Sequence, residues 1–244
     1  MELTANVNWA SYALQYDMLF QYNPFYRELH REVMELVKNW EIPHGSVLAD
    51  IGAGTGNYSL SMAELFPQAT VLHVDKDPGM NAAARSKRPV SLTNHHIYQV
   101  GVDEIELASD HLSGLISVHA LYTFPKPEKV LRQMYDWLQP GAPAILVNAG
   151  RMVNVLSWQV AIGWHLIRNH GLRRALEIMQ LGKEVSRQNA YIRDMQRQGI
   201  YWMHSHQEFC EAVSRAGFKI QSARTTFRGI SDLVIAVKPT TPTS

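Results

Sequence analysis

The chain has 244 residues, of which 46% are hydrophobic and 18% are charged. This composition fits one α/β domain with insertions and excludes a globally disordered chain. The formal net charge is +1 and basic residues form no run, so no nucleic-acid partner is indicated. The single cysteine, Cys210, can form no internal disulfide, which is typical of a reducing compartment, and we expect it to be a small buried hydrophobe.

We find no segment that could cross a membrane. The most apolar stretch, residues 153–167, is interrupted by Asn154, Ser157, Gln159 and His165, and it is shorter than the roughly 20 residues that a span requires. The N-terminus lacks the basic segment and apolar run that are typical of a signal peptide. We therefore expect a cytoplasmic protein without a stable membrane span.

The first forty or so residues predict helices. Asn23 can cap a helix and Pro24 suits its first turn, and Leu29, Val33 and Val37 recur at helical spacing. Strands and helices then alternate in this order: strand 47–49, helix 57–66, strand 70–74, helix 78–87, strand 97–102, strand 114–119, helix 127–138 and strand 144–147. Such alternation predicts a parallel sheet that is buried on both faces.

The alternation then ends. Residues 151–204 contain helical patterns and no strand pattern, so we expect a helical insertion. Ser205 begins a further helix, because Glu208 follows at the spacing of a capping box. Two extended runs, residues 218–227 and 232–237, are close enough that they can be joined only as a hairpin, which adds an antiparallel edge to the sheet.

These elements predict a doubly wound α/β fold with a mostly parallel, seven-stranded sheet and an antiparallel edge strand. We expect a single domain over residues 1–244. Within it, residues 1–44 would form an N-terminal helical cap, residues 45–150 and 205–238 the core sheet, and residues 151–204 a lid.

A glycine-rich loop, residues 50–56, follows the first strand and opens a helix. Its alternating glycines let the backbone turn sharply and let a ligand approach, at the end of the strand where parallel sheets bind ligands. The dinucleotide fingerprint has the spacing G-x-G-x-x-G, whereas here the third glycine comes one residue early and Asn57 takes the dinucleotide position. The second strand ends in Asp75, which could bind the ribose of either kind of cofactor.

The pattern G-x-G-x-G preceded by an acid resembles motif I of the class I S-adenosylmethionine-dependent methyltransferases. The resemblance continues over residues 125–151, where a helix is followed by Leu138-Gln139-Pro140-Gly141 and a strand, and in the closing hairpin. Similar features run from about residue 9 to residue 237. Ala142 departs from the pattern, because the family usually has a second glycine there.

The resemblance implies that S-adenosyl-L-methionine is the cofactor. By position, Asp50 would lie near the methionine ammonium, Asp75 would bind the ribose and Asp103 would accept from the adenine amino group. The other cofactor residues that it implies are Gly52, Ala53, Gly54, Gly56, Lys76, Met80, Tyr12, Tyr16 and His119. Met80 also fits plain helix core, and Asp103 also fits a solvated loop.

His119, at the end of the fourth strand, is the candidate general base, because imidazole titrates near neutral pH. The alternatives are a ligand to the cofactor and a packed strand-end histidine. Residues 9–17 resemble the tyrosine-rich helix that closes over the cofactor in many relatives. Tyr12 and Tyr16 share one helix face there, and Tyr16 is a second candidate for the reacting end.

The resemblance implies that the insertion builds the substrate pocket. The candidate substrate residues are Tyr122, Trp158, Tyr201 and His204. The arginines of the insertion fit either a solvated face or a lid over an apolar or acidic substrate, and they are Arg173, Arg174, Arg187, Arg193 and Arg197. Its apolar first part also fits a homodimer contact. His204 and His206 lack a third ligand, so we expect no metal.

The expected function is methyl transfer from S-adenosylmethionine to a small, apolar or aromatic molecule. The same pocket could instead transfer or cyclise the aminocarboxypropyl arm and release methylthioadenosine, because cofactor motifs do not determine which carbon beside the sulfur is attacked. The glycine spacing disfavours a nicotinamide-dependent oxidoreductase. The intact glycines and acids disfavour a non-catalytic protein that only binds the cofactor or a partner chain.

Overall fold

The computed structural model describes residues 9–240, except for the side chains at positions 9–12, 14, 15, 19, 183–186 and 188. Its sheet has seven strands in the order β3-β2-β1-β4-β5-β7-β6. The strands are β1 (Val47–Ile51), β2 (Thr70–Val74), β3 (His95–Tyr98), β4 (Gly114–Val118), β5 (Pro143–Ala149), β6 (Lys219–Thr226) and β7 (Ser231–Val237).

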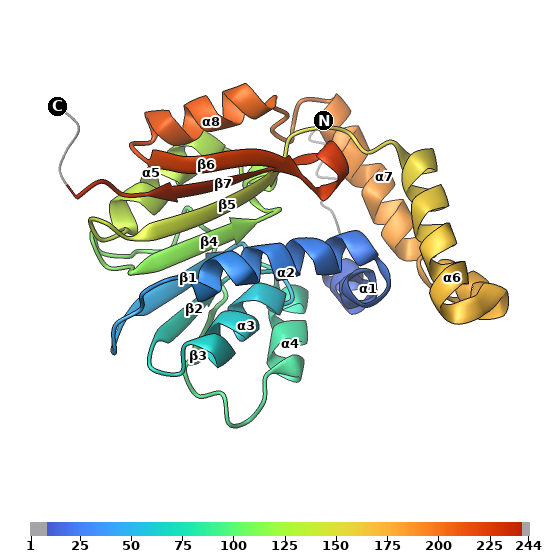
Figure 1. Cartoon of the computed structure of the whole chain (residues 1–244), viewed down its shortest axis with the longest axis horizontal. Helices are drawn as coiled ribbons and strands as arrows, with labels where there is room; N and C mark the ends of the chain where they lie inside the picture. The colour runs from blue at the N-terminus through green and yellow to red at the C-terminus, as the bar shows by residue number, and fades with distance from the viewer. Residues whose placement is uncertain (1–8, 241–244) are drawn as a thin grey trace.

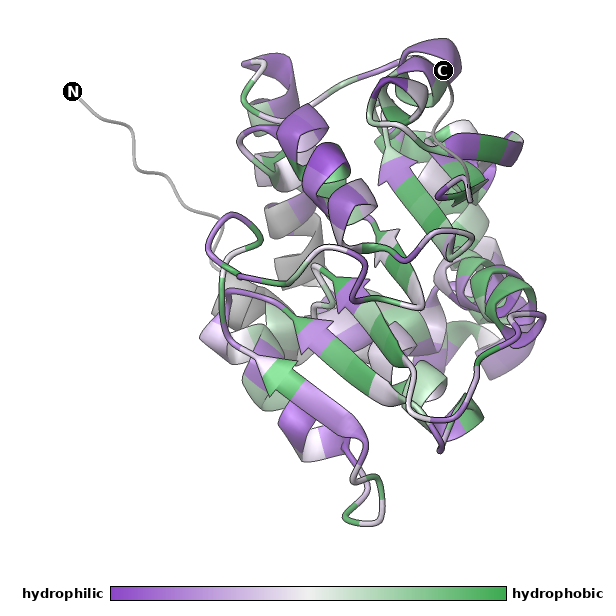
Figure 2. Cartoon of the chain, turned by 90° about the vertical axis from the view of Figure 1, so that its left-hand side faces the viewer, coloured by the Kyte–Doolittle hydropathy of each residue, from purple (hydrophilic) through white to green (hydrophobic). Residues whose placement is uncertain are grey.

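Strands β1 to β5 pair in parallel, whereas β7 runs antiparallel between β5 and β6. The predicted fold class, including the antiparallel edge, is therefore confirmed (Figure 1). Hydrophobic residues follow the strands (Figure 2), because the central strands are covered on both faces.

Two layers of helices enclose the sheet (Figure 1). One face carries α2 (Pro24–Lys38), α3 (Asn57–Leu65) and α4 (Pro78–Lys87), and the other carries α5 (Pro127–Trp137) and α8 (His206–Arg215).

Local sequence signals place two of these helices as predicted. The side chain of Asn23 caps α2 by accepting a hydrogen bond from the Phe25 amide, and Leu29, Val33 and Val37 are buried against the sheet. The capping box of Ser205 with Glu208 at the start of α8 is also present. Both helix starts are thus determined by residues within a few positions of them.

The third strand differs from the prediction of residues 97–102. It spans His95–Tyr98, because its neighbour β2 ends at Val74, the residue that pairs with Tyr98. Val100 and Val102 continue the apolar alternation, but they pack on the core beside the sheet instead of pairing in it. A strand needs a neighbour with which to pair, and the sequence pattern does not show where that neighbour ends.

The remaining helices lie at the carboxyl ends of the strands. Helix α1 (Trp9–Tyr22) contacts α4 and α7. The insertion after β5 consists of α6 (Val155–Leu181) and α7 (Lys183–Arg197), which extend beyond the sheet (Figure 1). Helix α6 is broken at Gly171, where φ is 75° and ψ is 161°. Within residues 9–240, none of the helices is both long and apolar enough to cross a membrane.

Candidate active site

A cavity of about 730 Å³ opens at the carboxyl ends of β1, β2 and β4. It lies at the point where the strand order reverses, because β2 and β3 continue on one side of β1 and β4 and β5 on the other. The predicted residues in its wall are Asp50, Gly52, Ala53, Gly54, Asp75, Lys76, Met80, Asp103, Tyr16, His119, Tyr122 and Trp158. The side chain of Tyr12 lies outside the described residues.

The three loop glycines have different roles, although all have positive φ. A Cβ at Gly52 would overlap the side chain of Ala120, so this glycine permits close packing beneath the cavity. A Cβ at Gly54 would meet nothing closer than the Met80 sulfur at 4.0 Å, so its backbone is open to a ligand. Gly56 does not line the cavity as expected, because it packs against Ala84 and His73 at the start of α3.

One oxygen of the buried Asp50 carboxyl group has no hydrogen-bond partner among the described residues. The Asp50 side chain is 1% exposed, and its Oδ2 atom accepts no hydrogen bond within the described part of the chain. Burial, and then the charge of Asp75, raise the pKa of Asp50 to about 8. A buried carboxylate that lacks a partner is costly, so a bound cation would stabilise it.

Asp75 is held rigidly in the cavity wall. Its Oδ2 accepts from the amide of Gly54 at 2.8 Å and its Oδ1 accepts from the amide of Asp77 at 2.9 Å. Burial raises the pKa of Asp75, while these two amides oppose that shift. Each carboxylate oxygen has a second lone pair, so hydroxyl donors such as those of a ribose could still bind. The two acids and the bare Gly54 backbone therefore fit S-adenosylmethionine.

Helix α1 is attached to the glycine loop by Asp17, a residue that the sequence analysis did not identify. Its Oδ1 accepts from the Thr55 hydroxyl at 2.7 Å and from the Lys87 ammonium at 2.8 Å. This contact brings the adjacent Tyr16 to the cavity wall, where it packs near Met80. The sequence gives no sign that Asp17 pairs with Lys87, because the two residues lie 70 positions apart in the chain.

His119 does not titrate near neutral pH in the folded protein. Burial lowers its pKa to about 4, so its imidazole is neutral at pH 7. Its Nε2 lies 2.8 Å from the Ser231 hydroxyl, and its ring packs on Phe227 with centroids 4.7 Å apart. The backbone of His119 has a φ of 54°, which is rare for a residue with a side chain. The general-base role of His119 remains a prediction. Its pKa, however, does not lie near neutral pH, as the sequence-based argument assumed.

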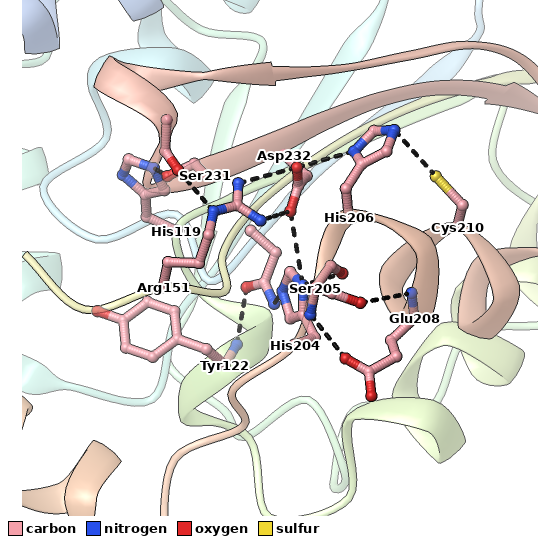
Figure 3. A network of polar contacts seen from close by, with 12 residues as sticks. His119, Tyr122, Arg151, His204, Ser205, His206, Glu208, Cys210, Ser231 and Asp232 are labelled. Carbon is pink, nitrogen blue, oxygen red and sulfur yellow. Dashed lines mark hydrogen bonds and ion pairs between the residues drawn. The ribbon is translucent and has the colours of Figure 1, made fainter.

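Asp232 joins both ends of the insertion to β7 (Figure 3). Its carboxylate is fully buried and accepts two hydrogen bonds from the Arg151 guanidinium, at 2.8 and 2.9 Å. The Nδ1 of His206 donates to the same carboxylate at 2.8 Å. Arg151 precedes α6 and His206 follows α7, so one acid anchors both linkers.

His204 is a buried core residue and is absent from the cavity wall, contrary to the prediction. Its Nε2 accepts from the Asn148 amide at 2.8 Å, and its ring stacks on Phe209. Tyr201 is also absent from the cavity wall and packs edge-on against Tyr122, with ring centroids 5.5 Å apart. Within the described residues, His204 and His206 belong to no cluster that could hold a metal ion.

Comparison with known proteins places this site in a family. Residues 48–141 match a family model described as a methyltransferase domain. The chain is 34% identical to the trans-aconitate 2-methyltransferase of Deinococcus radiodurans, over 41% of the chain and 36% of that protein. It is 26% identical to the 2-methyl-6-phytyl-1,4-hydroquinone methyltransferase 1 of Oryza sativa subsp. japonica, over 43% of the chain and 31% of that protein.

These alignments span about a third of the length of both relatives. The solved structure of an S-adenosylmethionine-dependent methyltransferase from Aquifex aeolicus matches with a TM-score of 0.60 and 13% identity, over 94% of the chain and 98% of that structure. At this identity the match shows the fold alone. The family model covers the glycine loop and both acids, so residues 48–141 contain a methyltransferase domain, and the chain shares the fold of the S-adenosylmethionine-dependent methyltransferases.

Proposed function

We propose that the chain transfers the methyl group of S-adenosylmethionine to a small, apolar or aromatic molecule. The observation that carries this proposal is one cavity whose wall has two chemically different parts. The glycine loop and the acids form one part, the first end, and α6 contributes mostly hydrophobic side chains to the other, the second end.

At the first end, Asp50 would pair with the methionine ammonium and Asp75 would accept from the ribose. Gly54 would leave room for the cofactor against the backbone. Met80 would pack on the adenine, and Asp103 would accept from its amino group at the cavity rim. When bound, the cofactor supplies a methyl group on a positively charged sulfur.

At the second end, Trp158, Ile162 and Leu166 of α6 face the cavity. Hydrophobic walls exclude water and hold an apolar acceptor beside the cofactor, which methyl transfer by in-line displacement requires. Tyr16, Tyr122 and His119 also line the cavity. A neutral His119 could orient a nucleophile by a hydrogen bond or accept its proton.

Methyl-labelled cofactor, incubated with the protein and a cell extract, tests this proposal. We expect labelled small molecules together with S-adenosylhomocysteine as the spent cofactor. Release of methylthioadenosine would instead show that the aminocarboxypropyl arm reacts. The variant Asp75→Asn should bind S-adenosylhomocysteine at least about tenfold more weakly, because charge-assisted hydrogen bonds are lost. Glu64→Gln, an exposed change on α3, is the matched control.

A further inference from the structure

The charges in the cavity wall are distributed unevenly. The acids come from the end of β1 and from the loops after β2 and β3, and they are Asp50, Asp75, Asp77, Asp103 and Glu104. The wall formed by α6 and α7 contains hydrophobic and neutral polar residues and one charged residue, Arg193. The Arg193 guanidinium therefore lies in a part of the wall that contains no carboxylate.

Among the residues that the structure describes, the charge of Arg193 has no partner. Its Nε atom is buried and has no hydrogen-bond acceptor, and the ion pairs found among the described residues do not include it. Arg151, the other arginine in the wall, is by contrast paired with Asp232 through two hydrogen bonds. A buried donor without an acceptor destabilises the folded state, so it marks a position where a ligand could supply the missing group.

The neighbours of Arg193 on α7 strengthen this interpretation. Asn189 and Gln196 also line the cavity, and they lie four residues before and three residues after Arg193. Residues at these spacings share one helix face. The cavity-facing side of α7 thus presents a guanidinium between two amides, in the same cavity that the hydrophobic residues of α6 line.

We infer that the substrate is an amphiphilic carboxylic acid whose carboxylate binds Arg193 and whose apolar body packs on Trp158, Ile162 and Leu166. This inference rests on the proposed methyl transfer and specifies its substrate class. A carboxylate is favoured over a phosphate monoester, because one cation balances one negative charge, whereas a phosphate monoester carries nearly two. The planar guanidinium also matches a carboxylate through two parallel hydrogen bonds.

Calorimetric titration with matched acids and alcohols tests this inference, in the presence of saturating S-adenosylhomocysteine. The probes are octanoate against octanol and cinnamate against cinnamyl alcohol. The wild type should bind each acid at least about tenfold more tightly than its alcohol. Arg193→Gln should reduce this preference to less than about twofold, and Arg193→Lys should retain part of it. The control is Arg197→Gln, because Arg197 is exposed and lies 3.6 Å from Asp194.

Two results would overturn the inference. One is an equal affinity for acids and alcohols in the wild type, or the absence of binding by all four probes. The other is a loss of S-adenosylhomocysteine affinity in Arg193→Gln, which would assign Arg193 to the carboxylate of the cofactor. Failure of the wild type to bind S-adenosylhomocysteine would instead contradict the proposed function. The preference for acids over alcohols can be measured separately, in the absence of S-adenosylhomocysteine.

Discussion

At the scale of single residues, we expect Asp50 to couple cofactor binding to pH. Its pKa is raised to about 8, so without a bound cation the carboxyl group is mostly protonated at pH 7. Pairing with the ammonium group of a cofactor requires the carboxylate, so binding must release a proton below this pKa. We predict that S-adenosylhomocysteine binds more tightly as the pH rises from about 6 to about 8, by at most about tenfold per unit.

Calorimetry in buffers of different ionisation enthalpy measures this proton release directly. Asp50→Asn should bind more weakly and release no proton, because an amide does not titrate. A wild-type affinity that stays constant across the same pH range would contradict this assignment of Asp50.

Gly52 and Gly54 allow a comparison of two glycines with the same backbone conformation. Their φ values are 75° and 56°, where a residue with a Cβ costs roughly 1–2 kcal/mol. Gly52→Ala should lower the free energy of unfolding by more than this, because the methyl group overlaps Ala120. Gly54→Ala should lower the free energy of unfolding only by the roughly 1–2 kcal/mol that its backbone conformation costs. It should weaken S-adenosylhomocysteine binding, because its methyl group enters the cavity.

Urea unfolding and calorimetry separate these two effects. Equal stability losses in both variants would show that the packing of Gly52 on Ala120 contributes nothing to folding.

At the scale of elements, the insertion depends on a single acid. Removing the charge of Asp232 leaves Arg151 without its partner, and losing one member of a buried pair typically costs about 3–5 kcal/mol. Arg151 is 31% exposed, so we expect Asp232→Asn to cost roughly 2–3 kcal/mol. Proteolysis within residues 151–204 should also become faster, because the linkers on both sides of α6 and α7 contact Asp232.

The matched control is Asp110→Asn, which breaks an exposed ion pair with Lys238 and should cost less than about 1 kcal/mol. If both variants lose the same stability in urea unfolding, Asp232 does not anchor the insertion.

At the scale of the whole molecule, buried histidines make the fold sensitive to acid. Burial lowers the pKa of His73 to about 3 and the pKa values of His95 and His119 to about 4. The unfolded chain protonates these rings below pH 6.5, whereas the folded protein keeps them neutral. Stability should therefore fall as the pH drops from 6.5 towards 4, by up to about 1.4 kcal/mol per unit for each histidine.

The raised pKa of Asp50 acts in the opposite direction, because its folded-state carboxyl group retains a proton up to about pH 8. Burial also raises the pKa of Asp75, which acts in the same direction as Asp50. Three histidines against these two acids leave a net loss of stability in acid. Urea unfolding at about pH 6.5 and about pH 4.5 measures it. A midpoint that is unchanged or higher at the lower pH would contradict this account.

Local patterns predicted much of the fold. The caps at Asn23 and Ser205, the alternation of strands and helices and the glycine loop all depend on neighbouring residues. The positions of Asp50 and Asp75 at adjacent strand ends follow from the parallel alternation, because such ends meet at one edge of the sheet. The sequence by itself therefore determined the architecture and the location of these two acids beside the glycine loop.

The tertiary structure decided properties that depend on distant partners. The end of β3 depends on where β2 stops, and the packing role of Gly56 depends on Ala84. Burial makes His119 neutral, and packing on Phe209 holds His204 in the core, although the sequence marked both histidines as candidate site residues. Arg193 differs from the other arginines of the insertion only in what surrounds it, because desolvation and pairing are properties of the folded chain.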